Sequence, residues 1–314
     1  MKKFIYSMMV GAAVLLTACG NGSASTDSSS NSSTEAATEV TIQDSDGEVT
    51  VPKDPQKVVV FDNGSLDTMD ALGVGERVIG APTKSLPSYL ASYQKVENAG
   101  GIKEPDLEKI NQLQPDLIII SGRQRDFKED LNAIAPTIFL SVDAKDTWNS
   151  TKQNIQTLAT IFGKETVATE KIATLDQEIT ALQAQAKDSG KALVTLVNEG
   201  QLSAYGKGSR FGIIHDTFGF PEADDKIEAS THGQSVSYEY VLEKNPDILF
   251  VIDRTKAIGG DTSKDDVAAN ELVKETNAGK NHKVIQLAPD IWYLSGGGLE
   301  STQKMIEDVK AAFE

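Results

Sequence analysis

The stretch LEKINQLQPDLIIISGR at residues 107–123 decides the fold, because it returns as YEYVLEKNPDILFVIDR at 238–254. Each copy has a short helix-forming segment, then Pro-Asp, then an apolar run, then an arginine. A helix followed directly by a buried strand is the repeating unit of parallel α/β folds. Corresponding residues of the two copies lie 131 positions apart. The repeat predicts two similar α/β lobes; the alternative is that a common α/β phrase has recurred by chance.

The residues before the first copy extend the same pattern. VTIQDSDGEVTVP at 40–52 alternates apolar and polar residues about Asp46-Gly47, which predicts a hairpin. KVVVFD at 57–62 is a continuous β-branched run, and RVIGAP at 77–82 is a second short strand. The helical stretch between them completes a strand–helix–strand unit. This alternation favours a parallel sheet covered by helices.

A helical region separates the two copies. Residues 147–162 form one predicted helix, which is closed by Gly163, and residues 164–187 form a second. The second helix would extend about 35 Å at 1.5 Å per residue. A single helix of this length is a stiff connector between two lobes. The predicted fold is therefore α/β, with two Rossmann-like lobes that contain parallel sheets and are joined by one long backbone helix.

The first residues are typical of an exported lipoprotein. A basic start and an apolar run too short to span a bilayer make residues 1–18 a predicted signal peptide. The sequence Leu-Thr-Ala-Cys at 16–19 resembles a bacterial lipobox, so we expect a lipid on the Cys19 thiol. Residues 19–39, rich in Ser and Thr, are a predicted flexible tether. We expect the chain on the extracytoplasmic face of the cell membrane, at a Gram-positive surface.

The remaining boundaries follow from the strands and helices. We predict an N-terminal lobe at 40–146, a helical connector at 147–188 and a C-terminal lobe at 189–314.

Composition excludes several kinds of function. A formal net charge of −16 argues against binding to nucleic acid or directly to anionic lipid. One cysteine and three histidines are too few for a cysteine zinc site or a receptor of bare zinc or manganese. No G-x-S-x-G, H-E-x-x-H or Walker sequence is present, so we predict that the chain is not an enzyme.

Arginines mark the candidate site, since the chain has only five of them against 25 lysines. Arg123 and Arg254 follow strand ends, where ligands of open parallel sheets bind. Arg210 lies in the glycine-rich loop YGKGSRFG. A guanidinium stays charged when partly desolvated and stacks on aromatic rings, which suits a bulky aromatic anion. The alternative is that Arg123 and Arg254 only cap strands or pair with Asp126 and Asp253.

Two further loops carry polar residues that the pattern alone does not single out. His232 lies in ASTHGQS, and Tyr293 lies in IWYLSGGGLES before the last helix. The glycines at 296–298 are not followed by a Walker lysine, so they favour a tight turn into the helix rather than a phosphate cradle.

Several stretches in order carry a resemblance to a known family. These are VVVFDNGSLDTMDALG, QPDLIIISGRQ, GSRFGIIHD, THGQS, LEKNPDILFVIDR and WYLSGGGLES. Together they resemble the siderophore-binding lipoproteins of ABC importers, which are helical-backbone (class III, cluster A) substrate-binding proteins. The chain is most similar to the receptors of ferric enterobactin fragments or petrobactin. The resemblance covers nearly all of 40–314 and implies a periplasmic-binding-protein-like fold.

The resemblance also implies roles for particular residues. Arg123, Arg210 and Arg254 would hold an iron–catecholate anion. His232 and Tyr293 would ligate Fe(III) when the siderophore supplies only four donor atoms. Arg125 departs from the family pattern as an added cation, which either widens the range of anions accepted or pairs with Asp126.

The resemblance implies the remaining partners as well. Glu108 and Glu239 would dock on the membrane permease, which works with its ATPase. We expect a ferric siderophore, tetra- or hexadentate, as the transported ligand, no intrinsic cofactor, no nucleic acid, a lipid anchor in the membrane and a monomeric state. The alternatives are a receptor for another iron compound such as haem, or for a hydroxamate siderophore. An enzyme and a surface adhesin are further alternatives, which the motifs and the arginines disfavour.

Overall fold

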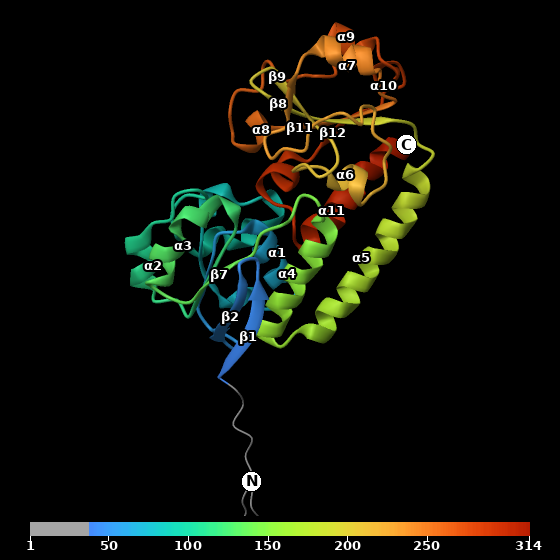
Figure 1. Cartoon of the computed structure of the whole chain (residues 1–314). Coiled ribbons are helices and arrows are strands. Elements are labelled where there is room, and N and C mark those ends of the chain that lie inside the picture. Colours follow the sequence, from blue (N-terminus) through green and yellow to red (C-terminus); the bar gives the residue numbers. More distant parts are fainter. Residues whose placement is uncertain (1–37) are drawn as a thin grey trace, which may run out of the picture. The chain divides into compact units, whose positions relative to one another are not determined.

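The structure is a computed structural model that describes residues 38–314 (Figure 1). The predicted signal peptide, the predicted lipidation site Cys19 and nearly all of the predicted 19–39 tether lie outside the described residues. Within residues 38–314, no helix is both long enough and apolar enough to cross a membrane. Residues 38–314 all belong to one compact unit. The proposed lobe boundaries at 146 and 188 therefore stay a prediction.

The first half of the described chain is built on a five-stranded parallel sheet with the order β5-β4-β3-β6-β7. Its strands are β3 (Val58–Val60), β4 (Val78–Ala81), β5 (Glu97–Asn98), β6 (Leu117–Ile120) and β7 (Thr137–Phe139). The central strands β3 and β6 pair with Val59 opposite Ile118, and every residue of both is buried. Burial on both faces explains why these strands are continuous apolar runs in the sequence.

Helices and a hairpin surround this sheet. The helices are α1 (Asn63–Ala71), α2 (Leu107–Leu113) and α3 (Lys128–Asn132), with short 3₁₀ turns η1 (Gly75–Arg77), η2 (Thr83–Ser85), η3 (Ser88–Lys95) and η4 (Gly122–Phe127). The predicted hairpin is confirmed: β1 (Glu39–Asp44) and β2 (Gly47–Pro52) pair antiparallel, with Asp44 opposite Gly47.

The second half contains a five-stranded sheet with the order β10-β9-β8-β11-β12. Its strands are β8 (Ala192–Asn198), β9 (Gln201–Tyr205), β10 (Gln234–Val236), β11 (Ile248–Asp253) and β12 (Val284–Leu287). Strands β8, β11 and β12 are parallel, whereas β9 and β10 run antiparallel, so this sheet is mixed. The chain reverses at Glu199 and Gly200, whose φ angles of 52° and 83° are typical of a tight hairpin turn.

The helices of the second half are short except for the last. They are α6 (Ile213–Asp216), α7 (Tyr238–Lys244), α8 (Arg254–Ala257), α9 (Glu271–Lys274), α10 (Asn277–Lys280) and α11 (Leu299–Lys310), followed by η6 (Ala311–Phe313). The sequence repeat has the same local structure in both copies. Helices α2 and α7 each have seven residues, begin at a side-chain cap and end at a left-handed residue, Gln114 or Asn245.

Two helices connect the sheets, with the bounds that the sequence predicts to within one residue. Helix α4 (Thr147–Phe162) ends at Gly163 in the left-handed conformation, and α5 (Glu165–Ala186) follows. Figure 1 shows α5 running beside α4 and α11. Its buried stripe includes Leu175, Ile179 and Leu182. Because α5 leads from the first sheet to the second, it is the single long connector that the sequence indicates.

A buried carboxylate joins the two ends of the described chain. Asp67 of α1 accepts hydrogen bonds from the backbone N–H groups of Glu300 (3.2 Å) and Ser301 (3.0 Å) at the start of α11, and from the Tyr89 hydroxyl (3.0 Å). Burial raises the pKa of Asp67 to about 7, although these hydrogen bonds oppose the rise. The N-terminus of α11 is thus occupied by an anion from the chain itself.

The glycines before α11 permit this approach. Gly296 and Gly297 have φ angles of 89° and 73°, which favour glycine. A Cβ atom on Gly298 would lie 2.1 Å from Oδ1 of Asp67. The interpretation of these glycines as a tight turn rather than a phosphate cradle is consistent with this packing.

We predict that Asp67→Ala lowers the free energy of unfolding by about 1–3 kcal/mol, because it leaves the buried N–H group of Ser301 and the partly buried N–H group of Glu300 without an acceptor. Asp67→Asn should recover part of this loss, since the amide oxygen can still accept. Urea denaturation followed by circular dichroism measures both. Asp188→Ala, which removes an exposed carboxylate, is the control. Equal stability of Asp67→Ala and the control would contradict the capping role.

Candidate ligand-binding site

Tyr293 lies on a short π-helical turn, η5 (Asp290–Leu294), between β12 and α11. Such turns are rare and are frequent at functional sites. Side chains of the first half hold this turn at both ends. Oδ2 of Asp290 accepts from the Ser88 hydroxyl at 2.7 Å, and the Asn63 amide donates to the Leu294 carbonyl at 2.9 Å. Tyr293 therefore comes from the second half of the sequence but is fastened to the first.

Three arginines converge on this tyrosine. Nη2 of Arg123 and Nη2 of Arg210 each donate to the Tyr293 main-chain carbonyl oxygen at 2.7 Å. Nε of Arg254 donates to the Tyr293 phenolic oxygen at 2.8 Å. The guanidinium carbon of Arg210 also lies 4.4 Å from the centre of the tyrosine ring. The structure thus brings together four of the residues predicted for the site.

Two of the three arginines occupy matching positions of the sequence repeat, and the third does not. Arg123 lies in η4, which follows β6, and Arg254 is the first residue of α8, which follows β11. These are the matching carboxyl ends of strands in the repeat, where parallel sheets bind ligands. Arg210 has no counterpart in the repeat and comes from the loop after the antiparallel strand β9.

The site accumulates positive charge. Burial lowers the pKa of Arg123, and the neighbouring charge of Arg210 lowers it further, against the opposing influence of Asp62. Burial alone would raise the pKa of Tyr293, but the hydrogen bond and charge of Arg254, together with Arg210, outweigh it and hold that pKa below its usual value. A phenol that ionises readily next to several cations is suited to coordinate a metal ion.

No ion pair neutralises these cations. Among the residues that the structure describes, no carboxylate lies within 4.0 Å of the guanidinium nitrogens of Arg123, Arg210 or Arg254. The pairing of Arg254 with Asp253 is therefore not observed, because the Asp253 carboxylate instead caps α8 through the Lys256 N–H at 2.8 Å. The arrangement leaves donors and charge available to an anion.

His232 lies in the loop before β10 and is exposed. Its carbonyl oxygen accepts from the Tyr205 hydroxyl at 3.0 Å, and its N–H donates to the Ser230 hydroxyl at 3.1 Å. The Tyr205 ring packs edge to face against Phe211, with the two ring centres 4.7 Å apart, and the guanidinium carbon of Arg210 lies 5.0 Å from the centre of the Phe211 ring. Tyr205 therefore links the His232 loop to the arginine cluster. Within the described part of the chain, the imidazole ring has no hydrogen-bond partner.

Sequence reasoning missed two residues that support the cluster. Oδ1 of Asn198 accepts from Nη1 of Arg254 at 2.5 Å and fixes the direction of that side chain. Asn198 ends the parallel strand β8, so the rule that singled out the arginines could have found it. Tyr205 had no comparable signal, because it lies on an antiparallel strand that the sequence does not distinguish from a loop.

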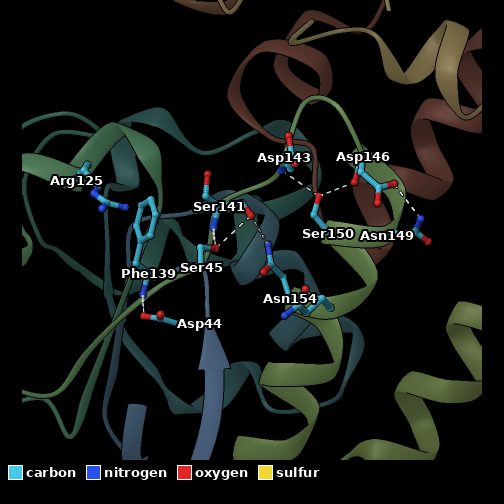
Figure 2. Close-up of a pocket in the computed structure, with 11 residues that line it drawn as sticks. Asp44, Ser45, Arg125, Phe139, Ser141, Asp143, Asp146, Asn149, Ser150 and Asn154 are labelled. Carbon is cyan, nitrogen blue, oxygen red and sulfur yellow. Dashed lines mark hydrogen bonds between the residues drawn. The ribbon is translucent and has the colours of Figure 1, made fainter. Parts of the chain in front are cut away.

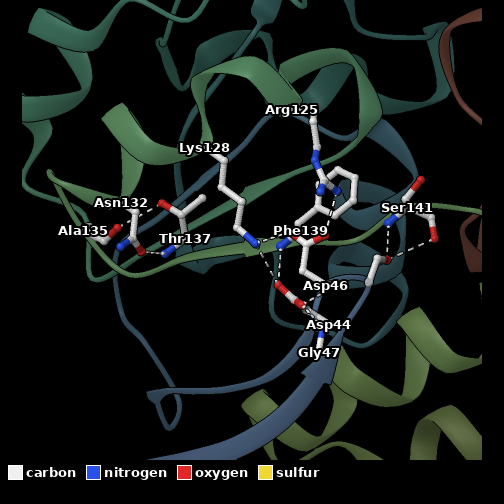
Figure 3. Close-up of polar contacts among 11 residues, drawn as sticks. Asp44, Asp46, Gly47, Arg125, Lys128, Asn132, Ala135, Thr137, Phe139 and Ser141 are labelled. Carbon is white, nitrogen blue, oxygen red and sulfur yellow. Dashed lines mark hydrogen bonds and ion pairs between the residues drawn. The ribbon is translucent and has the colours of Figure 1, made fainter.

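Arg125 does not join the other arginines. Its Nη1 atom lies 2.7 Å from Oδ1 of Asp46, and its guanidinium carbon lies 4.3 Å from the centre of the Phe139 ring (Figure 3). The predicted partner Asp126 is therefore replaced by Asp46. The reason is that the β1–β2 turn packs against β7, where the Phe139 N–H donates to Oδ2 of Asp44 at 3.0 Å.

Arg125 instead borders a separate polar hollow of about 560 Å³ (Figure 2). Carboxylates, amides and hydroxyls line most of it, including Asp143, Asp146 and Asn154. None of Arg123, Arg210, Arg254 and Tyr293 belongs to its lining. Across residues 38–314, no three His, Cys, Asp or Glu side chains are grouped so as to hold a metal ion.

The two glutamates of the repeat occupy matching exposed positions. Glu108 and Glu239 are each the second residue of a seven-residue helix, α2 or α7. A hydrogen bond from the Ser237 hydroxyl lowers the pKa of Glu239. Both carboxylates are thus exposed and placed at helix starts, where negative charge is favoured.

Comparisons with known proteins agree with this architecture. The sequence pattern of the family described as Periplasmic binding protein matches residues 58–291. The petrobactin-binding protein YclQ of Bacillus subtilis is 46% identical over 100% of both chains. Its crystal structure superposes with a TM-score of 0.86, covering 88% of this chain and 99% of that one.

Two more distant relatives show the same similarity. The ferric-anguibactin-binding protein FatB of Vibrio anguillarum is 33% identical over 88% of each chain. The crystal structure of the periplasmic catecholate-siderophore binding protein VctP of Vibrio cholerae has a TM-score of 0.81 at 34% identity, with 87% of this chain and 99% of that chain covered.

We predict that Tyr293 is the first of the described tyrosines to ionise as pH rises. Its pKa is lowered by Arg254 and Arg210, whereas burial raises the pKa of Tyr89, Tyr93, Tyr205, Tyr238 and Tyr240. Ultraviolet difference titration of phenolate absorbance measures this. The earliest transition should vanish in Tyr293→Phe and move to higher pH in Arg254→Gln. An earliest transition unchanged in both variants would refute the assignment.

Proposed function

The chain belongs to the Periplasmic binding protein family, and on that premise we propose that it is the extracytoplasmic receptor of an ABC importer and binds an anionic ferric catecholate siderophore. One observation carries the choice of ligand: guanidinium groups from both halves of the chain meet at Tyr293 without a carboxylate partner. Such a cluster favours an anion locally, although the chain as a whole has a net charge of −16.

The chemistry of a ferric catecholate matches these donors. Its oxygens are negatively charged phenolates, which accept charge-assisted hydrogen bonds, and its rings offer faces on which guanidinium groups stack. Arg123, Arg210 and Arg254 now donate to the oxygens of Tyr293, so ligand oxygens can take over those donors with little rearrangement. The names of YclQ, FatB and VctP, which refer to petrobactin, ferric anguibactin and catecholate siderophores, support the same ligand class.

His232 and Tyr293 are proposed as protein ligands of the iron. Ferric iron takes six donor atoms and prefers hard oxygens, so a tetradentate siderophore leaves two positions open. The lowered pKa of Tyr293 favours a phenolate ligand, and the unbonded ring of His232 is free to supply a nitrogen. A hexadentate siderophore fills the iron shell by itself and has no need of either residue.

The remaining partners are proposed on the same basis. Glu108 and Glu239 project from the two copies of the repeat and would dock on the permease, which acts with its ATPase. A lipid on Cys19 would hold a monomeric receptor at the outer face of the cell membrane. Curated relatives named as substrate-binding lipoproteins support the anchor. Arg125 is not proposed as a direct ligand contact, because it is paired with Asp46.

We predict that Arg123→Gln, Arg210→Gln and Arg254→Gln each weaken binding of a ferric catecholate by about 1–3 kcal/mol, the scale of a charged hydrogen bond. Quenching of intrinsic fluorescence during titration measures the affinity. Arg77→Gln is the control, since Arg77 pairs with Asp54 outside the cluster. A panel that includes haem and a ferric hydroxamate tests the alternatives, and haem binding would appear as a sharp Soret band. Unchanged affinity in all three variants would rule out the proposed site.

We further predict that His232→Ala and Tyr293→Phe weaken a tetradentate ferric complex far more than a hexadentate one. The physical reason is that only the tetradentate complex needs protein atoms to complete the iron shell. Titration of each variant with both complexes gives the comparison, and the charge-transfer absorption band of the bound iron should shift only with the tetradentate ligand. Equal losses with the two complexes would argue against direct ligation.

A further inference from the structure

The turn at residues 141–146, between β7 and α4, is held in one conformation by its own polar groups. The Asp143 N–H donates to the Ser150 hydroxyl at 3.0 Å (Figure 2). Oδ1 of Asp143 accepts from the Lys145 N–H at 2.9 Å. The Ser141 N–H donates to the Ser45 hydroxyl at 2.7 Å, which fastens the turn to the β1–β2 hairpin. These hydrogen bonds hold the turn at residues 141–146 in place.

The 141–146 turn contacts the loops that carry the proposed ligand-binding residues. Val142 packs against the backbone of Gly297, which is four residues after Tyr293. If Gly297 had a Cβ atom, that atom would lie 2.5 Å from Cγ2 of Val142. Cγ of Lys145 lies 3.7 Å from the corresponding Cβ position of Gly208, two residues before Arg210. The same position at Gly208 is 3.6 Å from Cβ of Ala229, in the loop that leads to His232. The stem of Lys145 thus covers the junction of the Arg210 and His232 loops.

The ammonium group at the end of this stem is not held in an ion pair with any described residue. Lys145 is exposed, and within residues 38–314 no carboxylate oxygen lies within 4.0 Å of its ammonium nitrogen. Lys207, in the same glycine-rich loop as Arg210, differs in this respect, because its ammonium nitrogen lies 3.8 Å from Oε2 of Glu222. Of these two lysines beside the Arg210 loop, only Lys145 has no acidic partner.

We propose that Lys145 is a specificity-determining residue, a fourth cation at the rim of the arginine cluster that favours ferric complexes of higher negative charge. The inference rests on the proposed function. The three arginines hold the iron-bearing core, whereas Lys145 reaches from the 141–146 turn toward the part of the ligand that projects beyond them. Its long flexible stem lets the ammonium follow ligands of different size. Its contribution is electrostatic and depends on ligand charge and on salt.

The test compares Lys145→Gln with Lys207→Gln, which removes a matched but paired charge from the neighbouring loop. The probes are ferric enterobactin, a tris-catecholate, and the ferric complex of its linear two-catechol fragment, which carries less negative charge. We expect Lys145→Gln to weaken ferric enterobactin about two- to fivefold at low salt, and the fragment complex less, with the difference vanishing at high salt. Lys207→Gln should match the wild type with both probes.

The outcomes separate this inference from the function on which it rests. Equal affinity of Lys145→Gln and the wild type for both complexes would overturn the role of Lys145, as would equal losses for the two complexes or the same loss in Lys207→Gln. If the unmodified protein bound neither complex, the proposed function itself would fail. Binding of both complexes by every variant, with only the Lys145 substitution sensitive to ligand charge, supports the proposal.

Discussion

Two guanidinium groups share one carbonyl oxygen, and the rest of the site depends on that interaction. Arg123 and Arg210 would repel each other at this separation if nothing lay between them, and the carbonyl of Tyr293 supplies the partial negative charge that both need. The phenol of the same residue engages Arg254. One tyrosine therefore accepts hydrogen bonds from all three arginines. Its acceptors are a neutral carbonyl and a weakly acidic phenol, which an anionic ligand can replace.

The fold makes this convergence possible by fastening a segment of the second half to the first. Asp290, Leu294 and the start of α11 are bound by Ser88, Asn63 and Asp67 respectively. Tyr293 is thereby held beside Arg123, while Arg254 and Arg210 approach from the other sheet. The absence of side chains on Gly64 of α1 and on Gly298 allows the backbone before α11 to pass this close to α1. The packing of the segment before α11 against α1 therefore has two consequences. It stabilises the fold through Asp67, and it fixes the position of Tyr293 beside the arginines.

Local charge at the site opposes the charge of the whole molecule. A net charge of −16 repels anions at long range, but the screening length in physiological salt is about 8 Å, so a compact cluster of cations still attracts a ligand that has come close to it. Arg125, by contrast, is neutralised by Asp46, and this ion pair keeps it on the hairpin. Within the described residues, Arg123, Arg210 and Arg254 thus form a cluster of arginines without carboxylate partners, and attraction of an anion is local to it.

The sequence by itself determined the α/β class, the long connector and the positions of Arg123 and Arg254, because strand burial, helix periodicity and the repeat are properties of neighbouring residues. It also placed Arg210 in a glycine-rich loop, and family resemblance alone pointed to His232 and Tyr293. Only the tertiary structure decided that Asp46 rather than Asp126 pairs with Arg125, that Asn198 and Tyr205 support the cluster, and that the Tyr293 carbonyl is its centre. Those contacts join residues far apart along the chain, and their geometry comes from packing, which no local pattern encodes.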